Sequence, residues 1–458
     1  MGLAWKDYEK KQAEVMSFCD DYMAFLSKAK TERRFVQLAI EKAEAAGYRN
    51  IEEIIQKKEP LHPQDKVYMN QMNKAVALMQ IGDDPLEEGM NILGAHIDSP
   101  RLDLKQHPLY EEGDLAYFDT HYYGGVKKYQ WVTIPLAIYG VVVLKNGQTI
   151  DVAIGDKEED PVFVISDLLI HLASKQMNKK ADQVVEGESL NVTIGSIPLA
   201  DGKEDPVKAH ILQILKTNYG FEEEDFISAE LEVVPAGKAR SCGLDKSLIL
   251  AYGQDDKVCA YSSLRAMLED RHLQRTAACL LVDKEEVGSQ GATGMQSQFF
   301  EDFVAEVLYA LGKDSNLAVR RTLLHSAMLS SDVCAAHDPN YADVSSPNDN
   351  QPEFGYGLAF NKYTGARGKS GCNDANAEYI AQLRAVMEKG NVHWQTGELG
   401  KVDAGGGGTI AYILANYGMR VIDCGVPLHN MHAPHEVSSK ADVYEAYRGY
   451  KAFIEFMR

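Results

Sequence analysis

The apolar residues of this chain follow two different spacings. Over residues 7–47 they recur at the three-to-four-residue interval of amphipathic helices, and a further helix is predicted over 67–81. At the other end, residues 439–458 carry a stripe of valine, tyrosine and phenylalanine at the same interval. We interpret that aromatic stripe as the packed face of a terminal helix.

Five short, nearly continuous apolar runs lie between these ends, at 90–95, 247–252, 277–282, 323–329 and 421–425. Runs of this length are typical of strands buried on both faces in a mainly parallel sheet. Helices are predicted between them, for example over 257–269 and 294–311. The predicted class is therefore α/β, with a mixed sheet flanked by helices.

Residues 106–238 have a different pattern, in which apolar and polar residues alternate at 131–144, 190–197 and 226–234 between acidic loops. Such alternation predicts strands with one solvated face. We expect an inserted, β-rich α/β domain over 106–238, within a larger domain made of 1–105 and 239–458.

Composition and charge narrow the function classes. The chain has 458 residues, 45% hydrophobic and 25% charged, which is an ordinary globular composition. Lys and Arg total 47 against 67 Asp and Glu, and this net charge of −20 argues against a nucleic-acid partner. The chain contains no apolar run of about 18 residues, so no membrane partner is expected. Its seven cysteines include no CxxC pair, as is typical of a reducing, cytoplasmic location.

Each of the five apolar runs is followed by a histidine or a carboxylate. These residues are His96 and Asp98, Asp255, Glu285 and Glu286, Asp332, and His432. Ligands bind at the carboxyl edge of open α/β sheets, so we expect these side chains to converge there.

Imidazole and carboxylate ligands suit zinc, manganese or cobalt rather than a thiolate site. The set is too large for one tetrahedral ion and fits two ions about 3.5–4 Å apart, bridged by a carboxylate. Of Glu285 and Glu286, one would bind metal and the other would accept a proton from water. Asp98 is placed to orient the imidazole of His96.

Each of these residues also has a plain structural interpretation. His96 alone could be a buried, hydrogen-bonded histidine, Asp255 and Asp332 could be helix caps, and the glutamate pair could be a solvated turn. The glycine run 405–408 is either a flexible loop or a loop on the substrate side. A serine nucleophile finds no support, because the G-x-S-x-G elbow is missing.

Taken together, the motifs resemble one family from about residue 20 to the end. They are Gly-Ala-His96-Ile-Asp98-Ser-Pro, Asp255-Asp256-Lys257, Glu285-Glu286-Val-Gly-Ser289, Ser331-Asp332 with His337-Asp-Pro-Asn-Tyr341, Met431-His432, Tyr122-Tyr-Gly-Gly125, and His171-Leu172. The chain resembles the aspartyl aminopeptidases, the eighteenth metallopeptidase family.

The resemblance implies a dinuclear aminopeptidase that removes an N-terminal Asp or Glu from peptides. One ion would be held by His96, Asp255 and Asp332. The other would be held by Asp255, Glu286 and His432, with Asp255 bridging and Glu285 as general base. The resemblance implies zinc, with cobalt or manganese as alternatives. It also implies that the inserted domain mediates dimerisation, and that dimers assemble into a tetrahedral dodecamer.

Substrate contacts are predicted in the basic stretch 360–369. Lys362 resembles a family lysine and is preferred to Arg367 as the residue that binds the acidic side chain of the substrate. His337, near the place of a family histidine, is a further predicted substrate contact. His171 ends an apolar stretch, 162–172, that is predicted helical. It would either pack at a dimer interface or stabilise the oxyanion in a neighbouring subunit's cleft. Two alternatives stay open: a dinuclear aminopeptidase or deacylase with another side-chain preference, and a non-catalytic, shell-forming homologue.

Overall fold

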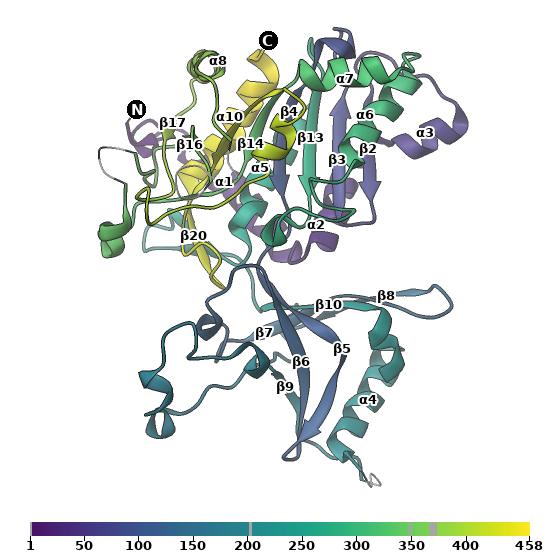
Figure 1. Cartoon of the computed structure of the whole chain (residues 1–458), viewed down its shortest axis with the longest axis vertical. Helices are drawn as coiled ribbons and strands as arrows, with labels where there is room; N and C mark the ends of the chain where they lie inside the picture. The colour runs from purple at the N-terminus through teal and green to yellow at the C-terminus, as the bar shows by residue number, and fades with distance from the viewer. Residues whose placement is uncertain (1, 201–203, 347, 349, 366–372) are drawn as a thin grey trace. The chain divides into compact units, whose positions relative to one another are not determined.

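The computed structural model describes residues 2–200, 204–346, 348, 350–365 and 373–458 (Figure 1). They form two compact units. The first contains residues 2–98, 239–431 and 436–458, and the second contains 99–238 and 432–435. The predicted α/β class with a mixed sheet is confirmed.

The first unit is built on a nine-stranded mixed sheet with the order β1-β2-β3-β13-β4-β14-β18-β16-β17. Its central strands β13, β4, β14 and β18 are parallel, whereas β3 and β16 run antiparallel to their inner neighbours. The bounds are β1 Arg49–Asn50, β2 Lys66–Gln71, β3 Ala75–Gln80, β13 Ala277–Val282, β4 Asn91–His96, β14 Ala327–Ser331, β18 Arg420–Gly425, β16 Leu358–Asn361 and β17 Trp394–Thr396.

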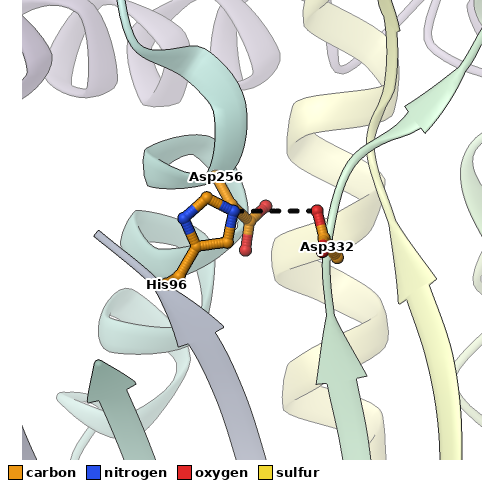
Figure 2. A group of neighbouring side chains, drawn as sticks. All are labelled: His96, Asp256 and Asp332. Carbon is orange, nitrogen blue, oxygen red and sulfur yellow. Dashed lines mark ion pairs between the residues drawn. The ribbon is translucent and has the colours of Figure 1, made fainter. Parts of the chain in front are cut away.

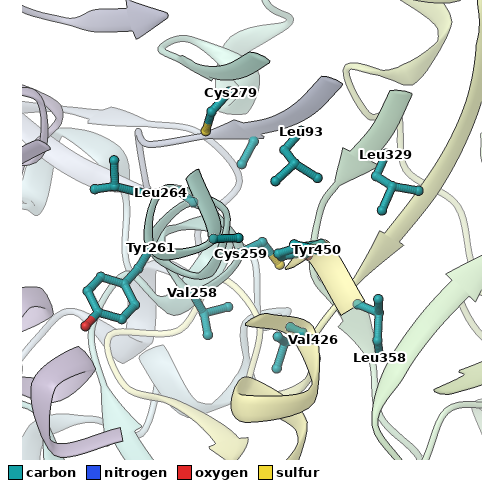
Figure 3. Packing of buried hydrophobic residues seen from close by; sticks show 14 of the residues in the cluster. Leu93, Val258, Cys259, Tyr261, Leu264, Cys279, Leu329, Leu358, Val426 and Tyr450 are labelled. Atoms are coloured by element: carbon teal, nitrogen blue, oxygen red, sulfur yellow. The ribbon is translucent and has the colours of Figure 1, made fainter. Parts of the chain in front are cut away.

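Helices bury both faces of this sheet, so successive residues of one strand enter different cores. Leu93 of β4 belongs to a core with α1, α2, α5, α8 and α10 (Figure 3), whereas Ile92 belongs to a core with α3, α6, α7 and α9. The bounds are α1 Gln12–Lys28, α2 Glu32–Ala45, α3 Ile51–Lys57, α5 Gln254–Met267, α6 Phe299–Ala310, α7 Asn316–Leu324, α8 Ala377–Lys389, α9 Ala411–Ala415 and α10 Lys440–Phe456. Two-sided burial explains why these strands are continuous apolar runs.

A smaller five-stranded sheet, β11-β12-β20-β19-β15, completes the first unit. The bounds are β11 Arg240–Cys242, β12 Leu248–Ala251, β20 Glu436–Ser439, β19 Pro427–His429 and β15 Cys334–Ala335. The run 247–252 is a strand, as predicted, but it lies here, antiparallel to both neighbours. The expectation that all five runs share one parallel sheet is therefore wrong for β12.

The second unit contains a six-stranded antiparallel sheet, β8-β7-β10-β5-β6-β9, and the α-helix α4 Pro206–Tyr219. The bounds are β8 Thr149–Ile154, β7 Leu136–Val143, β10 Ala229–Pro235, β5 Arg101–Glu112, β6 Leu115–Tyr123 and β9 Val192–Gly195. Across all the described residues, no helix is both long and apolar enough to cross a bilayer.

Two helix predictions are wrong. Residues 67–81 form the hairpin of β2 and β3, which turns at Met72 and Asn73, both with positive φ. All six residues of β3 are buried, so its apolar run shows no alternation that would distinguish it from a helix. The stretch 162–172 is irregular and ends in a single 3₁₀ turn, Ile170–Leu172. There Phe163 bridges to Leu136 and Val164 to Thr193, so tertiary pairing overrides the apolar pattern.

Candidate active site

Three adjacent parallel strands of the first unit end at one edge of the sheet. Strand β4 ends at His96, Asp332 directly follows β14, and Glu285 lies three residues beyond the end of β13. The ladder continues past the strand ends, since Ile97 N–H donates to the Val282 carbonyl at 2.8 Å. The predicted convergence at the carboxyl edge therefore occurs for these residues.

His96 is the centre of this group, with only 1% of its surface exposed. Its Nε2 atom lies 3.2 Å from a carboxylate oxygen of Asp255, 3.8 Å from one of Asp332 and 4.0 Å from one of Glu285. Figure 2 shows the imidazole directed toward Asp332, with Asp256 beside it. One imidazole nitrogen thus faces several carboxylates.

The two carboxylates from the start of α5 belong to different groups of candidate ligands around His96. Asp255 and Asp256 both have non-helical backbone angles at the start of this helix. One group joins His96, Asp256 and Asp332, and another joins His96, Asp255 and Glu286, with the ligand atoms of each group within 4.8 Å of one another. The first α5 turn is further held by Glu436, whose carboxylate accepts the Asp255 N–H at 3.0 Å.

Asp98 connects the imidazole to the glutamate pair. One of its oxygens lies 3.3 Å from His96 Nδ1 and accepts the Glu285 N–H at 3.2 Å. Its other oxygen accepts the Glu286 N–H, also at 3.2 Å. If a cation replaces the proton on Nε2, Asp98 keeps the remaining proton on Nδ1 and the Nε2 lone pair is free to bind that cation.

Burial and mutual repulsion dominate the electrostatics. Burial raises the pKa of Asp256 and of Asp332 well above the usual value, and the neighbouring charges of Asp255 and Glu285 raise it further, although His96 lowers it. Burial by itself would lower the pKa of His96, but hydrogen bonds with Asp255 and Asp98 raise it well above its ordinary value. The negative charges of these buried carboxylates therefore need compensation, either by bound protons or by a cation.

These residues fit a divalent cation of the zinc type. Imidazole nitrogen and carboxylate oxygen are the ligand atoms that such ions prefer. Both oxygens of the buried Asp256 carboxylate lack a conventional hydrogen-bond donor among the described residues, and the weak thiol of Cys259 is the donor acting on it. A dication would compensate this concentration of negative charge more effectively than protons can.

The other predicted residues lie elsewhere. His432 is grouped with the second unit, where its Nδ1 lies 2.9 Å from the Gly125 carbonyl oxygen. His171 is exposed in the second unit, and His337 Nδ1 contacts the Ser345 hydroxyl at 2.9 Å. Lys362 is exposed and lines a cavity of about 130 Å³ beside α8. Arg367 lies outside the described residues. The functional roles of these five residues stay predictions.

The position of Lys362 follows from strand direction. Strand β16 runs antiparallel to β18, with Asn361 opposite Asp423, so the chain at Lys362 leads away from the edge that carries His96. Asp256 was not predicted as a ligand from the sequence. The adjacent pair Asp255-Asp256 was the available signal, but it does not reveal that both carboxylates approach one imidazole.

Comparison with known proteins gives a consistent result along the whole chain. Residues 25–454 match the family described as aminopeptidase I zinc metalloprotease (M18). A probable M18 family aminopeptidase 1 from Clostridium acetobutylicum is 59% identical over 453 residues, which cover 98% of this chain and 97% of that protein.

Solved structures agree in fold. The M18 family aminopeptidase of Thermotoga maritima matches with a TM-score of 0.95 at 44% identity, over 100% of this chain and 99% of that one. The S. cerevisiae mApe1 dodecamer matches with a TM-score of 0.77 at 19% identity, over 95% of this chain and 96% of that one. At that identity, the second likeness shows the fold alone.

Proposed function

This chain belongs to the M18 family of aminopeptidase I zinc metalloproteases and is a metalloaminopeptidase; from that premise we propose a dinuclear site in which Glu285 is the general base. The convergence of His96 with the carboxylates of Asp255, Asp256, Glu286 and Asp332 at one sheet edge is the observation that supports it most strongly. These five side chains would hold the ions.

The sixth ligand in the proposal is His432, as predicted from the sequence. The carboxylates proposed as ligands of the same ion belong to the first unit, whereas His432 belongs to the second unit. Its role is therefore tested separately, by the zinc content of His432→Ala.

Zinc bound by these ligands would lower the pKa of its water ligand and polarise the scissile carbonyl. The chain's own residues then handle the proton. Glu285 lies 4.0 Å from His96 Nε2 and keeps 17% of its side chain exposed, so it is next to the candidate ligands and still accessible to solvent. It would take the proton from water and deliver it to the amine of the departing peptide. Asp98 holds His96 and both glutamate N–H groups in place.

For the substrate, we propose peptides with an N-terminal Asp or Glu, as the family resemblance suggests. An acidic side chain in a partly dry pocket needs a cationic partner. Lys362 was predicted for that role, but the antiparallel direction of β16 leads away from the metal edge. This observation favours the alternative candidate, an aminopeptidase of the same mechanism with another side-chain preference.

We also propose that the chain forms a homo-oligomer through the second unit. Leu169, Ile170 and Leu172 there are 54%, 68% and 67% exposed, and His171 lies among them. Exposed apolar side chains clustered in this way mark association surfaces. The S. cerevisiae relative is described as a dodecamer. Light scattering of the purified protein would measure the assembly size, and a monomer would refute the proposal.

The central test compares Glu285→Gln with a control, Glu53→Gln, an exposed glutamate in α3. Both proteins are stripped with a chelator, reloaded with zinc, cobalt or manganese, and assayed on aminoacyl chromogenic substrates. We expect Glu285→Gln to bind the normal amount of metal and to lose activity by about 100- to 10,000-fold. Normal turnover would exclude Glu285 as the base. The ratio of aspartyl to leucyl cleavage by the unmodified enzyme distinguishes the two substrate preferences.

A further inference from the structure

A buried ionic cluster lies at the start of the segment that carries Glu285 and Glu286. Asp283 follows β13 directly and is completely buried. Its carboxylate accepts a hydrogen bond from the Thr293 hydroxyl at 2.7 Å. The ammonium groups of Lys284 and Lys74 lie 3.4 Å and 4.0 Å from the same oxygen.

Lys74 connects this carboxylate to a distant part of the chain. It lies at the turn of the β2–β3 hairpin and is 14% exposed, and its ammonium group also pairs with Glu32 at 3.0 Å. Glu32 is the first residue of α2 and is 1% exposed. A second contact connects the same end of the hairpin to the segment after Asp283: the side-chain amide of Gln71 donates a hydrogen bond to the Ala292 carbonyl at 3.1 Å.

The segment after Asp283 has a constrained backbone. Lys284 adopts a positive φ of 72°, and a single 3₁₀ turn, Glu285–Val287, follows it. Asp98 holds the middle of this turn through the N–H groups of Glu285 and Glu286. The orientation of both glutamates therefore depends on how the chain is held at Asp283, two residues before the turn.

The charges explain why a cation from outside the segment is needed. Glu32, Asp98 and Asp283 are buried carboxylates, and the charges of Glu32 and Asp98 repel that of Asp283. Lys284 is 29% exposed and belongs to the segment itself, so it cannot anchor the segment to the rest of the fold. Lys74 can, because it sits between two of these carboxylates and is attached to the sheet.

We propose that Lys74 is a positioning residue for the peptidase reaction, whose ammonium group fixes Asp283 and thereby the turn that carries Glu285. The proposal rests on the function proposed above for Glu285. A displacement of about 1 Å at a catalytic group can reduce the rate by about 100-fold, so a remote lysine can have a large effect on kcat.

The test compares Lys74→Met with Lys66→Met. Lys66 lies on the same hairpin and is also 14% exposed, but it pairs with the fully exposed Asp270. At saturating zinc, we expect Lys74→Met to lower kcat by about 10- to 100-fold with KM nearly unchanged, Lys74→Arg to recover most of the loss, and Lys66→Met to retain normal activity. Equal kcat values for Lys74→Met and Lys66→Met would overturn the proposal.

Two further measurements separate positioning from general destabilisation. Thr293→Val removes only the hydroxyl donor to Asp283, and we expect a smaller loss of kcat without loss of the fold, as monitored by circular dichroism. In the Lys74→Met, Glu285→Gln double variant, we expect little further loss beyond Glu285→Gln alone, since Lys74 acts through Glu285. If the kcat losses of the two single variants multiply in the double variant, Lys74 does not act through Glu285. Full activity of Glu285→Gln would refute the general base instead, and the role of Lys74 would still be decided by its comparison with Lys66→Met.

Discussion

Replacing Asp98 by asparagine changes one atom at the junction between His96 and the glutamate pair. Both oxygens of the buried carboxylate are used: one faces His96 Nδ1 and the Glu285 N–H, and the other accepts the Glu286 N–H. The amide of asparagine keeps one acceptor and introduces an N–H₂ group. In either orientation that group faces a backbone donor, so a hydrogen bond is replaced by a donor–donor contact.

The magnitude follows from the hydrogen bond that the amide cannot accept. A hydrogen bond to a charged acceptor contributes about 1.5–3 kcal/mol, and no water can replace it because Asp98 is fully buried. At 1.36 kcal/mol per factor of ten, removing one such hydrogen bond corresponds to about 10- to 150-fold in kcat/KM, if the cost is expressed in the transition state.

The assay measures kcat and KM at saturating zinc, together with zinc affinity by competition with a chelator. Asp270→Asn is the matched control, because its carboxylate is fully exposed. We expect Asp98→Asn to fold normally, to bind zinc more weakly and to lose kcat/KM in the range above. A kcat/KM within about twofold of the control would refute the idea that Asp98 orients His96 and the turn.

Four further predictions concern single residues. Asp255→Asn should lower zinc content, because it removes a charge from the proposed bridge, and full double occupancy by metal analysis would exclude that role. Lys362→Met should reduce aspartyl relative to leucyl cleavage if Lys362 binds an acidic side chain, and an unchanged ratio would eliminate that assignment. Burial raises the pKa of Asp442 from 3.8 to about 7, so between these pH values the folded chain keeps a proton that the unfolded chain has lost. The free energy of unfolding is therefore highest below about pH 4. It falls by up to about 4 kcal/mol as the pH rises through 7. In denaturation experiments, the free energy of unfolding of Asp442→Asn should not show that decrease with pH. Parallel pH profiles of Asp442→Asn and the unmodified protein would contradict the prediction. Mixing inactive Glu285→Gln and His171→Ala subunits should restore some activity if His171 acts in the neighbouring subunit; full activity of His171→Ala alone, or no recovery after verified exchange, would rule this out.

The candidate site could be anticipated because strand burial and ligand chemistry are both local in sequence. Strands β4, β13 and β14 are buried on both faces, so they stand out as apolar runs. The polar residues that follow them must lie at the carboxyl edge if the strands are parallel. Asp255 was also predicted, although β12, the strand before it, belongs to a different sheet. The prediction succeeded because the first turn of α5 brings Asp255 close to His96.

Other features could not be predicted from the sequence, for identifiable reasons. The hairpin at 66–80 was predicted as a helix, because complete burial of β3 removes the alternation that marks a strand. The part played by Asp256 depends on the local backbone at the start of α5, where two successive residues are non-helical and their carboxylates belong to different groups. The direction of β16, which determines where Lys362 lies, is set by its pairing with β18 some 60 residues away in sequence.

The sequence by itself determined the chemistry of this protein: a histidine and several carboxylates placed after buried strands, with an acidic and otherwise ordinary globular composition. Tertiary structure alone decided which carboxylates face His96, and that Lys74 and Glu32 from the N-terminal part of the chain meet Asp283. The physical reason is that hydrophobic periodicity reports local burial. Ion pairs between residues some 200 positions apart depend on strand order and pairing direction, which periodicity does not encode.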